Sequence, residues 1–210
     1  MTLIAEVVAR LEAASSPHAM IGATAMAALG ATRSTQDLDI LTTDQAVMKS
    51  SFWRQLERSG ASVEVRSGDI QDPLVGVVRL MRSGDRPVDV IVGEAPWQIR
   101  ILSNASLRRV ADVEVPVVDA VGLILLKIYA GGPQDRWDIE QLLAIASERQ
   151  KLIDFGPPLY PQVDELVITG PAATNVASFD DLAETGLYVR QSSSYFEQAI
   201  QKQIGYKHDG

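Results

Sequence analysis

Short apolar segments of β type alternate with amphipathic segments of helical type over the first 150 residues. Apolar residues at helical spacing predict helices over 3–14, 23–29, 43–60 and 119–130, with one more beginning at Pro133. Alternating or continuous apolar runs predict strands over 37–41, 61–66, 74–81, 88–92 and 113–118. Because interleaved elements build layered folds, we expect an α/β (α+β) domain with a small mixed β-sheet flanked by helices.

The character of the sequence changes after Lys151. Four prolines lie between residues 157 and 171 in a stretch of weak periodicity, and only 181–204 has helical spacing. A chain of 210 residues can bury one full core and a modest addition. We therefore predict a domain over 1–150 and a C-terminal appendage over 151–210, whose residues indicate no role.

Composition limits the partners and the compartment. The net charge is −8 and cysteine is absent, which excludes disulfides and thiolate metal sites and favours a reducing cytoplasm. Broad binding to duplex DNA relies on a basic surface, so we do not expect it from this acidic chain. The longest apolar run, 121–126, is far shorter than the roughly 20 residues that span a bilayer, so we expect no membrane partner.

The pair Asp37 and Asp39 is the first indication of a site. Residues i and i+2 of a strand point to the same face, so both carboxylates project together while Leu38 packs behind them. Converging carboxylates need a compensating cation, and Mg²⁺ is the usual one where oxygen ligands meet substrate phosphates. A short Asp-x-Asp motif also arises by chance, in which case the two side chains are a solvated pair at a strand end.

Asp89 strengthens this interpretation. It lies in the otherwise apolar segment Val88-Asp89-Val90-Ile91, where an unpaired carboxylate costs several kcal/mol. If its strand lies beside the strand of Asp37 and Asp39, the three acids form one cluster. The alternative is an edge strand on which Asp89 faces water.

These residues resemble the signature of the DNA polymerase β nucleotidyltransferase superfamily. The signature residues are Ile21-Gly22-Ala23-Thr24, Gly30, Arg33, Thr35 and Asp37-Leu38-Asp39-Ile40. The form with an arginine shortly before the acids is most similar to the minimal nucleotidyltransferases, including the AbiEii-type toxin group. A second block, 119–143, resembles the downstream lysine helix and aspartate-bearing helix of the same group. The resemblance covers about 15–148 and implies a nucleotidyltransferase fold followed by C-terminal helices.

The resemblance also implies a reaction. A nucleoside monophosphate passes from a nucleoside triphosphate (NTP) to a hydroxyl, and pyrophosphate is released. Asp37 and Asp39 correspond to ligands of Mg²⁺ or Mn²⁺. Asp89 corresponds to the third carboxylate, which shares the metal and orients or activates the acceptor.

The same resemblance implies residues that bind the nucleotide. Gly22, Ala23 and Thr24 correspond to the segment whose backbone N–H groups approach the triphosphate at a helix N-terminus, where the dipole favours anions. Arg33 and Lys127 correspond to cationic groups near the phosphates. The family commonly has glycine or serine where this chain has Ala23, which lacks a hydroxyl; Thr24 is the residue that can replace that contact.

Simpler explanations stay open for several of these residues. Lys127 fits a long side chain that reaches water from an apolar helix. Asp135 and Asp138 fit the first turn of the last helix, where acids are favoured in any case. Arg33 fits a loop-steadying role as well as a phosphate contact.

The acceptor is the part of the function that the sequence leaves open. The toxin-like resemblance implies an RNA 3′ end or a protein hydroxyl as acceptor, and with it a toxin role and a cognate antitoxin protein. One alternative is the same chemistry on a small molecule of the antibiotic type. The other is a catalytically inactive interaction module that retains the fold.

Overall fold

The computed structural model of the chain describes residues 1–31, 35–68, 74–130, 133–145, 165–168 and 187–190. The contacts divide the chain into two compact units, Met1–Asp119 and Ala120–Gly210. The boundary predicted near residue 150 lies outside the described residues and stays a prediction. None of the helices in the described ranges is long and apolar enough to cross a membrane.

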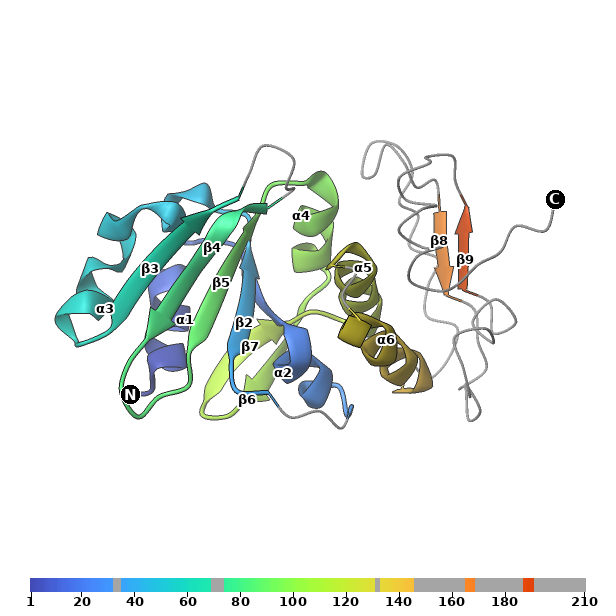
Figure 1. The fold of residues 1–210 in the computed structure, drawn as a ribbon, viewed down its shortest axis with the longest axis horizontal. Helices are drawn as coiled ribbons and strands as arrows, with labels where there is room; N and C mark the ends of the chain where they lie inside the picture. The colour runs from blue at the N-terminus through green and yellow to red at the C-terminus, as the bar shows by residue number, and fades with distance from the viewer. Residues whose placement is uncertain (32–34, 69–73, 131–132, 146–164, 169–186, 191–210) are drawn as a thin grey trace. The chain divides into compact units, whose positions relative to one another are not determined.

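The strands of the first unit form one mixed sheet. They are β1 (His18–Ile21), β2 (Leu38–Thr42), β3 (Ser62–Ser67), β4 (Leu74–Met81), β5 (Val88–Gly93), β6 (Ser106–Val110) and β7 (Val113–Val117). Their order across the sheet is β3-β4-β5-β2-β1-β7-β6 (Figure 1). The pairs β2/β5 and β1/β7 are parallel and the others antiparallel. This architecture confirms the predicted fold class of a mixed sheet with helices.

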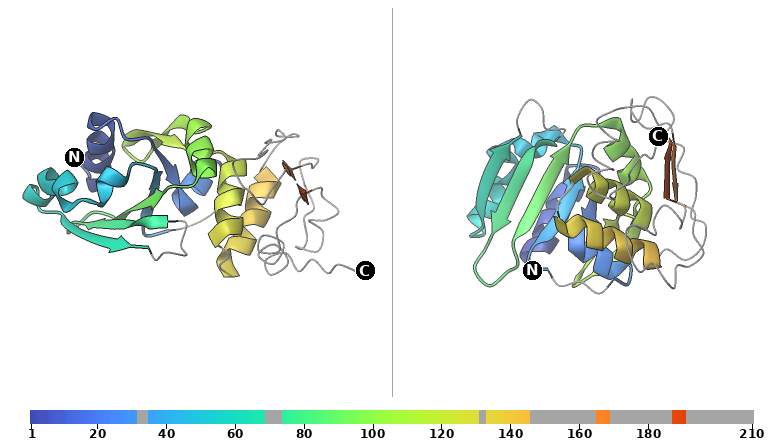
Figure 2. Two further views of the ribbon diagram at one scale, coloured as in Figure 1. Left: turned by 90° about the horizontal axis from the view of Figure 1, so that it is seen from above. Right: turned by 45° about the vertical axis from the view of Figure 1, so that its right-hand side comes forward.

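One face of this sheet carries the main core. The helices of the unit are α1 (Leu3–Ala13), α2 (Gly22–Ala28), α3 (Arg54–Arg58) and α4 (Pro96–Ser103), with 3₁₀ turns η1 (Gln45–Met48) and η2 (Ser50–Trp53). Helix α1 packs its buried stripe, which includes Leu3, Val7 and Leu11, against β5 and β7. Figure 2 shows α1 and α3 on the same side of β3, β4 and β5.

The side chains of strand β5 alternate between the two faces from Val88 to Val92. Val88, Val90 and Val92 are fully buried, whereas Asp89 and Ile91 are half-buried. Because neighbouring side chains of a strand point to opposite faces, Asp89 and Ile91 belong to the face opposite the valines. The apolar alternation therefore directs the acidic side chain of this strand away from the main core.

The helix predicted over 43–60 is broken into η1, η2 and α3. The Asp44 side chain accepts a hydrogen bond from the Ala46 N–H at 2.9 Å and so begins a tight turn instead of a helix. The indole N–H of Trp53, which is fully buried, donates to the Val47 carbonyl at 2.7 Å. Burial of this indole in the core outweighs the helical spacing of the apolar residues.

Three elements of the first unit escaped prediction. They are β1, α4 and β6, of four, eight and five residues. Helix α4 begins with Pro96, a favoured first position. β6 exposes most of its side chains and is held mainly by its antiparallel pairing with β7. Such short elements depend on their neighbours in space and carry little periodicity of their own.

The second unit contains helices α5 (Ala120–Ala130) and α6 (Pro133–Ile145), which pack against each other. Their positions agree with the predicted apolar helix and the helix that begins at Pro133. The unit also contains the antiparallel pair β8 (Glu165–Ile168) and β9 (Leu187–Arg190). The helix predicted over 181–204 is wrong at 187–190, where the residues pair as a strand; the remainder lies outside the described residues.

The fold makes a prediction for β2, the strand that carries the acidic pair. Ile40 is fully buried beneath the sheet, whereas Ile99 on α4 is 55% exposed. We expect Ile40→Ala to lower the free energy of unfolding by about 2–5 kcal/mol, because the substitution loses buried methylene groups and leaves a cavity. The matched control Ile99→Ala removes the same atoms from the surface and is expected to cost less than about 0.5 kcal/mol. Urea denaturation checks both; equal losses would contradict the placement of Ile40.

Candidate active site

The order of the strands brings the acidic residues of the sequence motif together. Parallel pairing of β2 with β5 sets Asp39 directly beside Asp89 in the register. Asp37 immediately precedes β2, two residues before Asp39. The strand of Asp89 therefore lies beside the strand of the acidic pair, which is the condition for a three-carboxylate cluster.

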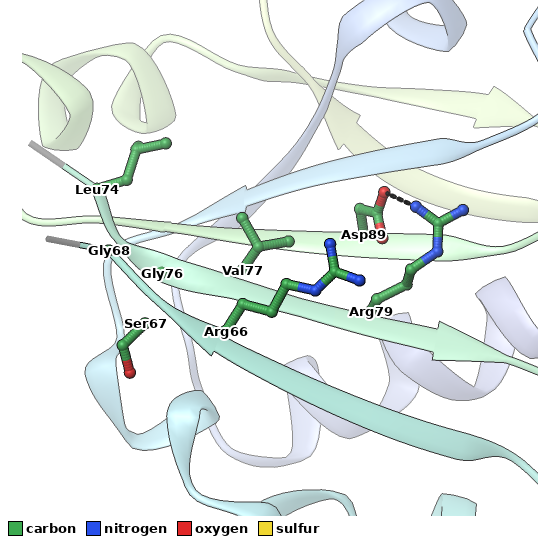
Figure 3. Close-up of a pocket in the computed structure, with 8 residues that line it drawn as sticks. All are labelled: Arg66, Ser67, Gly68, Leu74, Gly76, Val77, Arg79 and Asp89. Atoms are coloured by element: carbon green, nitrogen blue, oxygen red, sulfur yellow. Dashed lines mark hydrogen bonds and ion pairs between the residues drawn. The ribbon is translucent and has the colours of Figure 1, made fainter. Parts of the chain in front are cut away.

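Arg79 on β4 connects two of these carboxylates. Its register partner on β5 is Asp89. The guanidinium Nη1 lies 3.0 Å from Asp89 Oδ2, and Nη2 lies 3.3 Å from Asp37 Oδ1. Figure 3 shows the Arg79 side chain reaching Asp89. One guanidinium thus bridges the acid before β2 and the acid on β5.

Asp89 is the most buried of the three partners in this bridge. Its side chain is 16% exposed, compared with 31% for Arg79 and 40% for Asp37. Among the described residues, Asp89 Oδ1 is buried without a hydrogen-bond partner. Burial raises the pKa of the Asp89 carboxyl above its ordinary value, the positive charge of Arg79 opposes that rise, and the negative charge of Asp37 adds to it.

The backbone at the start of α2 lies against Asp39. Gly22 has φ +65°, and a Cβ placed on it would overlap Asp39 Oδ2. Glycine is therefore required here both for the left-handed backbone and for the close approach of the carboxylate. Ala23 and Thr24 follow as buried residues, and the Thr24 hydroxyl has no hydrogen-bond partner in the part of the chain that the structure describes.

Arg86 holds the segment that carries Asp37. Its Nη2 donates to the carbonyls of Thr35 and Asp37 at 2.9 and 3.1 Å, and its Nε donates to the Gln36 carbonyl at 3.2 Å. The Leu38 N–H donates to the Pro87 carbonyl at 2.9 Å. These bonds tie the approach to β2 to the turn before β5 and so position Asp37 beside Asp89.

A cavity of about 210 Å³ opens beside Asp89. Figure 3 shows the residues that line it, which come from β3 and the residue after it, β4 and β5. They are Arg66, Ser67, Gly68, Leu74, Gly76, Val77, Arg79 and Asp89. Arg66 is 67% exposed and forms an ion pair with Glu64 at 2.9 Å. The cavity is therefore bounded by cationic and apolar groups at the buried carboxylate.

The chemistry of the donor set fits a divalent metal ion. Carboxylate oxygens are the ligands that Mg²⁺ and Mn²⁺ prefer. Asp89 Oδ1 has no hydrogen-bond partner among the described residues and so keeps its lone pairs for such an ion. Within the described ranges, however, no three acidic or histidine side chains already lie close enough together to hold a metal.

None of the other residues predicted for the site belongs to the described part of the first unit. Arg33 lies outside the described residues. Lys127, Asp135 and Asp138 belong to the second unit, where Lys127 Nζ lies 2.9 Å from Asp135 Oδ1 and 2.6 Å from Asp138 Oδ2. Asp138 is fully buried and Lys127 is 14% exposed. These three residues join α5 to α6, and their predicted role with the nucleotide stays a prediction.

Arg79 and Arg86 were missed by sequence reasoning. Arg79 lies in the segment Val77-Val78-Arg79-Leu80, where a single charge interrupts an apolar strand just as Asp89 does. That signal was present and points to a charged partner across the sheet. Arg86 lies in a polar turn and gives no such signal.

Comparisons with known proteins find solved structures that resemble part of this chain. No protein-family model matches the chain, and no curated protein is similar to it. Among solved structures it is similar to an antigenic nucleotidyltransferase-like protein from Paracoccidioides brasiliensis, at 16% identity and a TM-score of 0.46, over 69% of this chain and 75% of that chain. It is also similar to the lincosamide antibiotic adenylyltransferase LnuA, lincomycin-bound, at 13% identity and a TM-score of 0.42, over 67% and 94%. Overlaps of this size identify no function for this chain.

The contact between Gly22 and Asp39 gives a testable prediction. We expect Gly22→Ala to cost about 1–2 kcal/mol for the left-handed backbone, plus a further cost because the new methyl group displaces the Asp39 carboxylate. Gly84→Ala is the matched control, since Gly84 has φ +84° and nothing lies within 4 Å of its added Cβ. Thermal unfolding of both variants measures the difference. Equal losses would mean that the carboxylate does not lie against this backbone.

The raised pKa of Asp89 predicts a pH dependence of stability. In the metal-free protein, Asp89 loses its proton at a lower pH when the chain is unfolded than when it is folded. Between these two pKa values the folded state therefore binds more protons, and the free energy of unfolding falls as the pH rises. Asp89→Asn removes this titration. We therefore compare the free energies of unfolding of Asp89→Asn and the wild type. The difference is expected to shift in favour of Asp89→Asn as the pH rises from below about 3.8, the ordinary pKa of this carboxyl, to above its raised pKa in the folded protein.

Urea denaturation in EDTA from acid to neutral pH measures this difference, and titrating groups that do not interact with Asp89 cancel. A relative stability of Asp89→Asn that decreases with rising pH would show that the Arg79 charge outweighs burial and lowers the pKa of Asp89.

Proposed function

We propose that this protein is a Mg²⁺-dependent nucleotidyltransferase, which moves a nucleoside monophosphate from an NTP to a hydroxyl of an acceptor. The observation that carries the proposal is the register of Asp39 beside Asp89, with Asp37 at the entry to the same strand. Three carboxylates near the N-terminal ends of two adjacent inner strands, beside a glycine that admits close approach, are the residue types that would hold a divalent ion and a triphosphate.

Asp37 and Asp39 would hold the metal, and Asp89 would complete the set. When bound, Mg²⁺ supplies charge neutralisation for the triphosphate and for the developing negative charge of the reaction. Asp89 would orient the acceptor hydroxyl and take its proton. The acceptor oxygen forms a bond to the α-phosphorus, the bond to the β-phosphate oxygen breaks, and pyrophosphate leaves.

The segment Gly22-Ala23-Thr24 would bind the triphosphate. The backbone at Gly22 lies against Asp39, so a phosphate held there lies next to the metal ligands. The unpartnered Thr24 hydroxyl is available as a donor in place of the serine that Ala23 does not provide. Arg33 and Lys127 would add positive charge near the phosphates, as the motif resemblance implies.

The acceptor that we propose is an RNA 3′ end or a protein hydroxyl, in the manner of a toxin that a cognate antitoxin neutralises in the cytoplasm. This part rests on the resemblance of the motif to the AbiEii-type group. A small molecule of the antibiotic type is the alternative acceptor. A chain that keeps the fold without catalysis is the alternative of a different class, and metal-dependent turnover of NTP separates it from an enzyme.

The proposal predicts pyrophosphate release that requires both metal and the acidic pair. The purified chain is incubated with Mg²⁺, each of the four NTPs in turn, and total RNA or cell extract as acceptor. Because the carboxylates hold the ion that supplies several kcal/mol of charge stabilisation, Asp37→Ala/Asp39→Ala is expected to lower the rate on the order of a thousandfold.

The control is Asp112→Ala, which makes the same truncation at an exposed turn between β6 and β7. It is expected to release pyrophosphate at the wild-type rate. A labelled NTP then identifies the acceptor by the product that retains the label. No release with any NTP, together with no Mg²⁺-dependent change in melting temperature, would favour the non-catalytic module.

A further inference from the structure

The bridge that Arg79 makes between Asp37 and Asp89 suggests how the negative charges of the acidic residues are balanced when no metal is bound. We infer that the Arg79 guanidinium is the internal counter-ion of the metal-free site, and that Mg²⁺ must displace it from the two carboxylates in order to bind. The inference rests on the proposed function, since it assigns Arg79 a role toward the same metal. Arg79 is then a positioning residue that competes with the metal.

Charge balance is the first argument. Asp39 and Asp89 are register partners, and Asp37 lies close enough to Asp89 to share one guanidinium with it. Like charges at such separations repel unless a cation lies between them. Arg79 supplies that cation with two separate nitrogens, one for each carboxylate. The folded chain can therefore hold its acids together before any metal arrives.

Geometry is the second argument. A Mg²⁺ ion needs its carboxylate oxygens at about 2.0–2.1 Å in an octahedral arrangement. The described residues contain no acidic group of three in such proximity, and the guanidinium nitrogens lie at the Asp37 and Asp89 oxygens instead. A divalent ion placed on those oxygens would lie within a few ångström of the guanidinium and be repelled by it. Occupation by one cation therefore excludes the other.

The cavity supplies the room for this exchange. Arg79 lines it, and its side chain is 31% exposed. Figure 3 shows the guanidinium next to Asp89 among the residues that line this space. The guanidinium can therefore leave the carboxylates by rotation of its own side chain, without disturbing Val78 and Leu80, which are buried on the other face.

Competition of this kind has a measurable consequence. The apparent metal affinity is reduced by the fraction of molecules in which the guanidinium occupies the carboxylates. Arg79→Gln removes the competing charge and is expected to bind Mn²⁺ on the order of tenfold more tightly than the wild type. Arg66→Gln is the matched control, because Arg66 lines the same cavity, forms its ion pair with Glu64, and acts on Asp89 only through its charge and more weakly than Arg79. It is expected to change the Mn²⁺ affinity by less than about twofold.

The experiment titrates metal-free protein with Mn²⁺ alone and monitors binding by electron paramagnetic resonance. It compares the wild type, both glutamine variants and Asp37→Ala/Asp39→Ala. Tighter binding by Arg79→Gln only, and loss of binding in the double alanine variant, is the expected result. Equal or weaker binding by Arg79→Gln, with wild-type binding that still depends on Asp37 and Asp39, overturns the inference and leaves the proposed function standing. Absence of Mn²⁺ binding in every variant overturns both.

A second measurement uses the wild type and so does not depend on how well the variants fold. The guanidinium ¹⁵N resonance of Arg79 is followed as Mg²⁺ is added. We expect it to move to the position of a free, rapidly rotating guanidinium while the signal of Arg66 stays in place. A resonance of Arg79 that is unchanged when Mg²⁺ saturates the site overturns the inference.

Discussion

The parallel pairing of β2 with β5 is the contact on which the candidate site depends. It joins segments about fifty residues apart in the chain and sets Asp39 beside Asp89. The hydrophobic core fixes the register of this pair of strands, because Ile40 and Val90 are register partners and both are fully buried in the core. A slip of one residue would turn these side chains out of the core and the aspartates into it. The hydrophobic core thus sets the position of the carboxylates, although it makes no contact with a substrate.

The acidic site carries an electrostatic cost that the surrounding residues reduce. Burial and the neighbouring Asp37 both raise the pKa of Asp89, and Arg79 opposes them. The left-handed Gly22 allows the Asp39 carboxylate to lie against the backbone where any side chain would overlap it. Carboxylates held this close repel each other unless a cation lies between them, so the cluster costs stability that Arg79 restores in part.

Much of the fold could be predicted because the apolar pattern is a local property. The strand predicted over 74–81 has the bounds of β4, and the expected helices at 3–14 and 119–130 correspond to α1 and α5. Predictions failed where packing outweighed the pattern. The buried Trp53 broke the expected helix over 43–60, and β6 depends on its pairing with β7. The importance of Asp89 could be predicted because an acid in an apolar strand requires a partner.

By itself, the sequence determined which residues carry charge into apolar strands, because this follows from the chemistry of single residues and their immediate neighbours. Asp37, Asp39 and Asp89 were identified in this way, whereas Gly22 was singled out by the resemblance of the motif, and the structure showed why glycine is needed there. Only the tertiary structure decided which charges meet. Arg79 pairs with Asp37 and Asp89, and Lys127 with Asp135 and Asp138, because strand order and helix packing bring these side chains together. Strand order and helix packing depend on how much apolar surface the whole core buries, and a local stretch of sequence does not contain that information.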